Sequence, residues 1–310
     1  MYPRISDLFN DLFGFEFPFP IYSFGFMVAI GLMTGAWLLQ RELDRLHGMG
    51  RIGSITIDDP EEKRSGKKGR VRQVQVSPSY LVGTMTMLAI VGGFAGAKLF
   101  HILENLGDFF QDPLGMIFSS GGFTFYGGLI LAAILIARYV TSKGLSVPVV
   151  ADAIAPGLML AYGVGRIGCH LSGDGDWGIA ADIASKPDWL PMWLWAETYP
   201  NNILNIDLSA APVYPTPLYE LVAASLLFAV LYRFRDHVHR AGWLFWFYIT
   251  LNGVERFFIE KIRVNNRFDL FGITLTQAEL IALALVTAGV IGMVKFRKRA
   301  VSEPGAASGT

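Results

Sequence analysis

Seven long apolar runs, separated by polar and charged segments, dominate the pattern of this chain. A bilayer core of roughly 30 Å needs about 20 apolar residues to cross as a helix. Backbone groups in lipid must be bonded within their own segment, so each run is expected to be helical. The pattern therefore predicts an all-α polytopic membrane protein with about seven transmembrane helices. The runs are Ile21–Gln40, Tyr80–Leu99, Gly122–Ala137, Val147–Val164, Pro217–Tyr232, Trp243–Ile259 and Phe271–Val294.

Basic residues gather in alternate connections between these runs, and this predicts one orientation. Loops rich in Lys and Arg stay in the cytoplasm. The basic segments are the loop 41–76, Arg138 and Lys143, Arg233 to Arg240, and the end of the last run, Lys295 to Arg299. Seven spans then place the N-terminus outside and the C-terminus in the cytoplasm of a bacterial cytoplasmic (inner) membrane.

The rest of the chain divides around this membrane domain, 21–299. Residues 1–20 carry aromatic and acidic residues without a basic leader, which favours a segment lying on the membrane over a cleaved signal. Residues 174–216 hold Trp177, Trp189, Trp193, Trp195 and Tyr199 among prolines, and we expect a small outward-facing cap on the outer leaflet rather than a plain loop. The tail 300–310 is small and polar and is expected to be disordered.

Composition agrees with a membrane protein. The chain is 52% hydrophobic and 17% charged, with a mean hydropathy of +0.41. Its 26 basic and 26 acidic residues cancel, so net charge gives no reason to expect a nucleic-acid partner, and none is expected. A single cysteine excludes an intrachain disulfide.

The segment GRIGCHLSGDGDWG, residues 165–178, follows the fourth run and joins an arginine to several glycines. An arginine at membrane depth is costly and is kept where it pairs with something. Arg166 can bind phosphate through two parallel hydrogen bonds, and Gly168 lets a backbone or ligand approach. An arginine that only reaches toward the interface is the alternative for this segment taken alone.

The sixth run ends in a polar stripe. Asn252, Arg256, Glu260 and Arg263 recur at helical spacing. An Arg256–Glu260 pair would keep Glu260 ionised and leave Arg263 free to meet an external anion. A structural salt bridge between helices is the alternative.

Other polar residues lie at the same ends of the runs. They are Lys98, His101 and Glu104 on the second, His170 after the fourth and Glu220 at the start of the fifth. Gly127 and Tyr126 belong to a glycine-rich start of the third run, which permits close helix packing. Pro215 and Pro217 suit the first turn of the fifth helix.

In this order, the segments resemble the bacterial prolipoprotein diacylglyceryl transferase family. The motifs that carry the resemblance are IYSFG at Ile21–Gly25, GGFTFYGGLI at Gly121–Ile130, DAIAPGL at Asp152–Leu158, GRIGCHLSGDGDWG, PTPLYE at Pro215–Glu220 and RFFIEKIR at Arg256–Arg263. Four positions depart from the family pattern: Tyr126 stands in place of a histidine, Cys169 in place of an asparagine, Phe24 in place of a tyrosine and Pro217 in place of a glutamine. The glycine–aspartate stretch is also one residue longer than in the family pattern.

The resemblance implies a reaction. A diacylglyceryl group moves from phosphatidylglycerol to the lipobox cysteine of a signal-peptide-bearing prolipoprotein, and glycerol 1-phosphate is released. Arg166 and Arg263 match the family's anion-binding arginines. The candidates for phosphatidylglycerol binding are Arg166, Arg263, Lys98, Glu220, Gly168 and Gly127. Tyr126 and His170 are the catalytic candidates beside the two arginines.

The base that deprotonates the substrate thiol stays open between Tyr126, His170 and His101. The displacement needs no metal or cofactor, and we expect none. Two rival functions remain: a transporter or channel for an anionic small molecule or lipid, which favours ionisable residues nearer the midplane, and a hydrolase built on Ser172.

Overall fold

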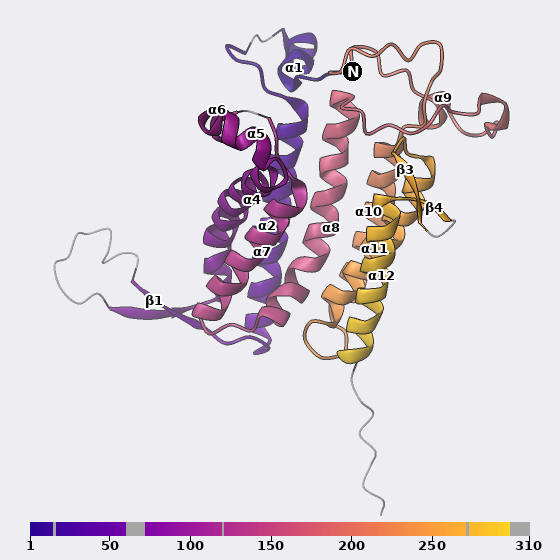
Figure 1. Cartoon of the computed structure of the whole chain (residues 1–310). Helices are drawn as coiled ribbons and strands as arrows, with labels where there is room; N and C mark the ends of the chain where they lie inside the picture. Colours follow the sequence, from indigo (N-terminus) through magenta and orange to yellow (C-terminus); the bar gives the residue numbers. More distant parts are fainter. Residues whose placement is uncertain (15–16, 60–71, 120, 271–272, 298–310) are drawn as a thin grey trace, which may run out of the picture. The chain divides into compact units, whose positions relative to one another are not determined.

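A computed structural model describes residues 1–14, 17–59, 72–119, 121–270 and 273–297 (Figure 1). The chain forms two compact units. The first joins Met1–Gly31 to Leu158–Thr310, and the second is Leu32–Gly157. Helices α2 (Ser23–Gly48) and α8 (Val147–Ser172) are each divided between the two units, with one end in each.

The expected polytopic all-α architecture is confirmed. Six helices in the described part of the chain are long and apolar enough to cross a membrane. They are α2, α4 (Val82–Glu104, preceded by the short helix η1, Pro78–Leu81), α7 (Phe125–Ser142), α8, α10 (Thr216–Arg233) and α12 (Gln277–Lys295). The expected sixth span is helix α11, Trp243–Ile259. Its 17 residues extend about 26 Å at 1.5 Å per residue, so this span stays a prediction.

Several expected boundaries are wrong. Helix α8 continues eight residues past Val164, to Ser172, so Arg166 lies inside it. Helix α2 likewise runs to Gly48 and absorbs the start of the expected basic loop. Helix α12 begins at Gln277 instead of Phe271, because Thr276 and Glu279 form a capping box there.

Two antiparallel strand pairs replace part of the expected basic loop, and the end of the last outer loop together with the start of the expected seventh run. Strands β1 (Ile55–Asp58) and β2 (Gln73–Val76) pair in the basic loop, and β3 (Arg267–Leu270) and β4 (Ile273–Thr276) pair before α12. The segments ITID and QVQV alternate with the period of two that is typical of strands. Four residues are too few for this alternation to predict a strand from the sequence. Residues 60–71 and the tail 300–310 lie outside the described residues.

In the second unit, α4 and α7 pack closely through glycines. A Cβ atom on Gly128 would lie 2.5 Å from the carbonyl oxygen of Gly93, and one on Gly96 would collide with the carbonyl of Gly127. The expected close packing at the start of the third run is therefore confirmed. The buried core of this unit includes Leu39, Leu81 and Val140. Two short helices, α5 (Leu106–Gln111) and α6 (Pro113–Phe118), follow α4.

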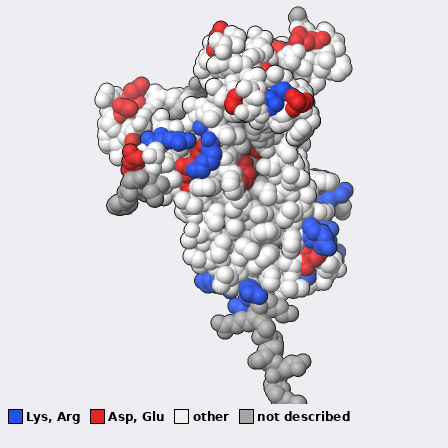
Figure 2. All heavy atoms as spheres, turned by 90° about the vertical axis from the view of Figure 1, so that its right-hand side faces the viewer, with Lys and Arg blue, Asp and Glu red and all other residues white. Residues whose placement is uncertain are grey.

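In the first unit, α11 lies beside α12, and α10 packs on α11 (Figure 1). Gly253 makes the contact between α11 and α12 close, since a Cβ there would lie 2.9 Å from the carbonyl oxygen of Ala282. Met159, Ala224 and Leu244 form the core. In the view of Figure 2, the surface over the middle of these helices is largely uncharged, as a lipid-facing surface should be.

The segment between α8 and α10 is folded rather than a plain loop. It contains η2 (Ile183–Ser185) and α9 (Met192–Trp195) and has its own core of Trp177, Tyr199 and Val213. Trp177 and Tyr199 are therefore buried and are not the surface anchors that the sequence suggested. Trp189 and Trp193 are exposed.

Replacing Gly96 by alanine should destabilise the α4–α7 pair. The new Cβ would collide with the carbonyl of Gly127, and overpacking of this kind costs about 1–3 kcal/mol. Gly93→Ala is the matched control on the same helix, because nothing lies within 4 Å of its Cβ position. Denaturant unfolding of both purified variants measures the difference. Equal stability of the two variants would contradict this packing.

Candidate functional site

Three arginines converge on one buried carboxylate, Glu220, in the first turns of α10. Glu220 has no exposed surface. Arg166 Nη1 lies 3.3 Å from Glu220 Oε2. Arg263 Nη1 and Arg256 Nη1 lie 3.5 Å and 3.8 Å from Oε1. A buried carboxylate without cations is strongly unfavourable, so these contacts explain how Glu220 can be there at all.

Asp176 links two of these arginines. Its Oδ2 accepts from Arg166 Nη1 at 2.6 Å, and its Oδ1 accepts from Arg263 Nη2. Burial by itself raises the pKa of Asp176, but Arg263 and then Arg166 outweigh burial and hold the pKa below its usual range. Asp176 is therefore a carboxylate that holds two guanidinium groups at a fixed separation.

Local backbone pairing positions this part of the site. The Gly178 and Arg263 backbones form an antiparallel bridge, and Ile179 N donates to Ile262 O at 2.8 Å. Gly178 is required for this approach, because a Cβ there would lie 2.6 Å from Ile262 O. Thr216, at the start of α10, donates to the carbonyl of Asp176 at 2.5 Å.

Arg166 is presented by α8 with a tyrosine one turn before it. Its guanidinium carbon lies 5.0 Å from the centre of the Tyr162 ring. Its Nε atom is buried and has no hydrogen-bond partner among the described residues. A buried N–H without an acceptor is unfavourable, so Arg166 retains a donor for a ligand oxygen.

The Arg256–Glu260 pair is confirmed, with Arg256 Nη2 2.8 Å from Glu260 Oε2. Asn265 also donates to Glu260 at 2.6 Å. The expected stripe, however, does not reach Arg263. Helix α11 ends at Ile259, and Arg263 follows η3 (Glu260–Ile262) in an extended conformation.

The expectation that Arg263 is free for an external anion is wrong, because it pairs with Asp176 and Glu220. The extended backbone after η3 turns it toward these carboxylates. Any external anion must compete with them.

We call Arg166, Arg256 and Arg263, with the carboxylates Asp176, Glu220 and Glu260, the arginine cluster. The contacts of His170 lie apart from this cluster. Its Nδ1 is 3.2 Å from the hydroxyl of Tyr199, in the core of the segment between α8 and α10. Gly168 has a packing role, since a Cβ there would lie 3.0 Å from the Cα of Phe24 in α2.

The other candidates, Lys98, Tyr126 and Gly127, belong to the second unit. Lys98 donates to the hydroxyl of Ser119 at 2.7 Å and to the carbonyl of Gly121 at 2.9 Å. Tyr126 is about half exposed. Gly127 faces α4, where a side chain would collide with Phe100.

Comparison with known proteins supplies the family. The family model described as prolipoprotein diacylglyceryl transferase matches residues 64–295. The chain belongs to this family.

Similar proteins cover almost its whole length. One is the phosphatidylglycerol–prolipoprotein diacylglyceryl transferase of Clostridium tetani, 26% identical over 289 residues, which are 93% of this chain and 98% of that protein. Proteins with the same name from Leptospira interrogans and Vibrio atlanticus are 26% and 27% identical, over 85% and 91% of this chain and 77% and 89% of theirs.

In this member of the prolipoprotein diacylglyceryl transferase family, sequence reasoning missed two residues of the site, Asp176 and Tyr162. Asp176 lay inside the quoted glycine–aspartate segment, but nothing in that segment indicated which aspartate faces Arg166. Tyr162 could have been found from spacing, because it lies four residues before Arg166. Reading Arg166 as the start of a loop concealed this relation.

Cys169, Asp174 and Asp176 bring potential metal-binding atoms within 4.8 Å of one another. Burial and the charge of Asp176 raise the pKa of Asp174, while both oxygens of Asp176 already bind arginines. A cation would have to displace two guanidinium groups, so this cluster is poorly suited to a metal.

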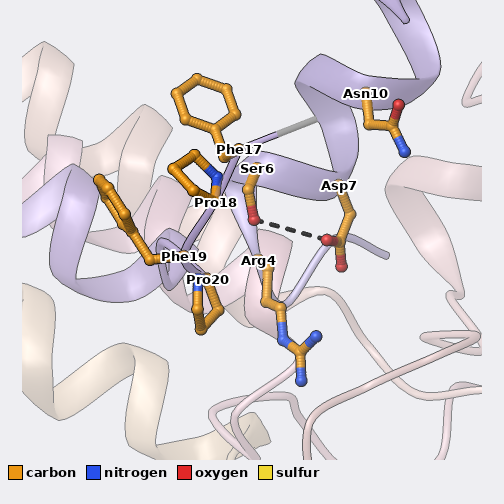
Figure 3. A pocket seen from close by; sticks show the side chains of 8 residues that line it. All are labelled: Arg4, Ser6, Asp7, Asn10, Phe17, Pro18, Phe19 and Pro20. Atoms are coloured by element: carbon orange, nitrogen blue, oxygen red, sulfur yellow. Dashed lines mark hydrogen bonds between the residues drawn. The ribbon is translucent and has the colours of Figure 1, made fainter. Parts of the chain in front are cut away.

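A cavity of about 270 Å³ lies elsewhere in the first unit. Figure 3 shows its lining, which comes from α1 (Ile5–Phe13) and the residues on either side of that helix. Arg4, Asp7 and Phe17 are among the lining residues. None of the residues of the arginine cluster lines it.

Asp176→Asn should make stability depend less on pH. The folded-state pKa of Asp176 is depressed, so its charge stabilises the fold above the unfolded pKa of about 3.9, and this stabilisation is lost as the pH falls through the folded pKa. The variant should unfold at a lower temperature than the unaltered protein at pH 7, with the gap closing below about pH 4. Asp188→Asn, which alters an exposed carboxylate, is the control. A gap that is the same at both pH values would contradict the assigned charge.

Proposed function

We propose that this chain transfers the diacylglyceryl group of phosphatidylglycerol to the thiol of a prolipoprotein lipobox cysteine and releases glycerol 1-phosphate. The observation that carries the proposal is the family match over residues 64–295, which includes every member of the arginine cluster. The chain is a multi-pass membrane protein with apolar helices suited to a lipid substrate.

The test is direct. Purified protein, phosphatidylglycerol and a lipobox peptide should yield a peptide heavier by one diacylglyceryl group, detected by mass spectrometry. An unmodified peptide, with phosphatidylglycerol intact and the protein folded, would contradict the proposal.

The proposed chemistry is a displacement at the glycerol carbon next to phosphate. The thiolate attacks carbon, the C–O bond breaks, and the electron pair leaves on the phosphate oxygen. Preorganised donors aimed at developing charge are worth about 3–4 kcal/mol each in a dry site. Arg166 and Arg263 suit this role because guanidinium stays protonated and binds phosphate through two hydrogen bonds.

Tyr126 is the proposed residue that orients or deprotonates the thiol, with His170 and His101 as the alternatives. Lys98, Glu220, Gly168 and Gly127 remain the proposed phosphatidylglycerol contacts. The hydrolase alternative has little support, since the hydroxyl of Ser172 donates to the carbonyl of Gly168 at 2.8 Å. A transporter would move a labelled anion without modifying a peptide.

We also propose that residues 1–20 and the segment 174–216 rest on the outer leaflet. Exposed apolar side chains suited to an interface are Leu12 and Phe13 on α1, Trp193 on α9 and Trp189 shortly before α9. The same orientation puts the C-terminus in the cytoplasm.

A topology reporter fused to the C-terminus should be active only in its cytoplasmic form, because the basic residues at the end of α12 are retained inside. A reporter placed between α9 and α10 is the internal control and should give the opposite result. A C-terminal reporter active outside the cell would reverse the orientation and move the proposed active face to the cytoplasm.

Arg166→Lys and Arg263→Lys should each lower the transfer rate about 10²–10³-fold, because lysine keeps the charge but loses the planar pair of donors. The rate is normalised to folded protein. Arg138→Lys, outside the cluster, is the matched control and should leave the rate unchanged. Near-normal activity of Arg166→Lys would reduce that arginine to an interfacial anchor.

Tyr126→Phe and Cys169→Ser separate a catalytic hydroxyl from packing, since both are small changes in volume. Tyr126→Phe should lose most of the transfer rate while still folding. Cys169→Ser should keep most of it, because the reacting thiol belongs to the substrate. Full activity of Tyr126→Phe with an inactive His170→Ala would assign the base to His170 instead.

A further inference from the structure

Arg166 uses only one of its three nitrogens within the arginine cluster. Its hydrogen bonds to the described residues both come from Nη1, which lies 2.6 Å from Asp176 Oδ2 and 3.3 Å from Glu220 Oε2. A carboxylate often binds arginine through two parallel N–H donors. Here two carboxylates share one nitrogen, and the donors on Nε and Nη2 have no acceptor in the described part of the chain.

The two unused nitrogens form one edge of the guanidinium group. Nε–H and one N–H of Nη2 point the same way in the plane of this group, as two parallel donors. Nε is buried, whereas Nη2 keeps some exposed surface, and 19% of the side chain as a whole is exposed. A phosphodiester has two non-ester oxygens, which match such an edge.

Each carboxylate gives Arg166 one oxygen because its other oxygen is already bound. Oδ1 of Asp176 accepts from Arg263 Nη2. Oε1 of Glu220 accepts from the hydroxyl of Tyr162 at 2.9 Å, which is its one hydrogen bond from the described residues. The guanidinium nitrogens nearest to Oε1 are farther away, at 3.5 Å and 3.8 Å. The tyrosine hydroxyl is therefore what holds Oε1 away from Arg166.

The same tyrosine contacts Arg166 through its ring. Tyr162 lies one turn before Arg166 on α8, and the guanidinium carbon is 5.0 Å from the ring centre. This contact restrains the guanidinium group without supplying an oxygen acceptor, so the N–H donors stay available. The hydroxyl also lies 3.4 Å and 3.5 Å from the two oxygens of Glu255, which are longer contacts than the one to Glu220.

We propose that Tyr162 is a positioning residue that keeps the Nε–Nη2 edge of Arg166 free for the phosphodiester of the lipid. Its ring restrains the guanidinium group, and its hydroxyl stops Glu220 from binding that edge with both oxygens. The inference rests on the proposed function, because it takes Arg166 as part of the phosphate site.

Tyr162→Phe removes the hydroxyl and keeps the ring. Glu220 can then turn both oxygens to Arg166 and compete with the phosphate. The Kd for fluorescent phosphatidylglycerol diluted in phosphatidylcholine bilayers should rise about fivefold, which corresponds to one ordinary hydrogen bond.

Tyr162→Leu removes the ring as well. The Kd should rise by a further factor of about 5–30, the range of a cation–π contact away from bulk water. Tyr248→Leu is the matched control, because it makes the same substitution beside the same core at a ring that packs on Phe245 with centroids 5.9 Å apart. This control should keep the wild-type Kd, and the KM for the lipobox peptide should be unchanged in all three variants.

A tyrosine that only fills the core gives a different result. Tyr162→Leu and Tyr248→Leu would then lower the amount of folded protein alike, and the folded fraction of both would bind phosphatidylglycerol as the wild type does. That result, or an equal rise in Kd for both, would overturn the inference and leave the proposed function standing. A wild-type protein with no preference for phosphatidylglycerol over phosphatidylcholine would contradict the proposed function itself.

A second measurement leaves Tyr162 unaltered. Nε and Nη nitrogens of arginine resonate apart in 15N NMR, so the nitrogen nearest to lipid phosphorus can be identified in the wild-type protein, with Arg166→Lys assigning the Arg166 signals. The 15N–31P contacts of Arg166 should include Nε. Contacts of Arg166 through Nη nitrogens alone would overturn the inference while still supporting a phosphate site.

Discussion

A carboxylate with no exposed surface, placed among membrane helices, must be surrounded by cations. Glu220 meets this requirement through Arg166, Arg256 and Arg263, which come from α8, α11 and the extended segment after η3. Bringing three guanidinium groups together is itself unfavourable unless carboxylates separate them. Asp176 and Glu260 do so. The ends of α8, α10 and α11 are thus tied together by one set of charges.

Backbone hydrogen bonds around the arginine cluster hold its charged residues in position. The antiparallel bridge between Gly178 and Arg263 and the hydrogen bond from Thr216 to Asp176 hold the segments that carry the charges. Such a group of donors can stabilise developing negative charge once an anion has taken the place of some carboxylate contacts. Because carboxylates already occupy these donors, an anionic substrate must replace some of their contacts. The Nε atom of Arg166, which has no hydrogen-bond partner in the described part of the chain, offers a first donor.

The sequence was informative where a local pattern determines structure. Long apolar runs predicted the helices, four-residue spacing predicted the Arg256–Glu260 pair, and Pro217 predicted the start of α10. It failed where contacts join distant segments. Gly168 packs against Phe24 from the last turns of α8, but the prediction ended this helix at Val164 because it followed only the apolar residues. Arg263 leaves the helical spacing because α11 stops at Ile259, and its pairing with Asp176 crosses 87 positions of sequence.

The central claim is that these arginines bind the phosphate of the lipid. Solid-state NMR of protein with 15N-labelled arginine in phosphatidylglycerol bilayers measures 15N–31P proximity directly, and Arg166→Lys and Arg263→Lys assign the signals. The account predicts guanidinium nitrogens at hydrogen-bond distance from lipid phosphorus, and each lysine variant should lack the 15N–31P signal of the arginine it replaces. A protein that catalyses transfer while showing no such signal, or one whose signals are the same in both variants as in the unaltered protein, would contradict it.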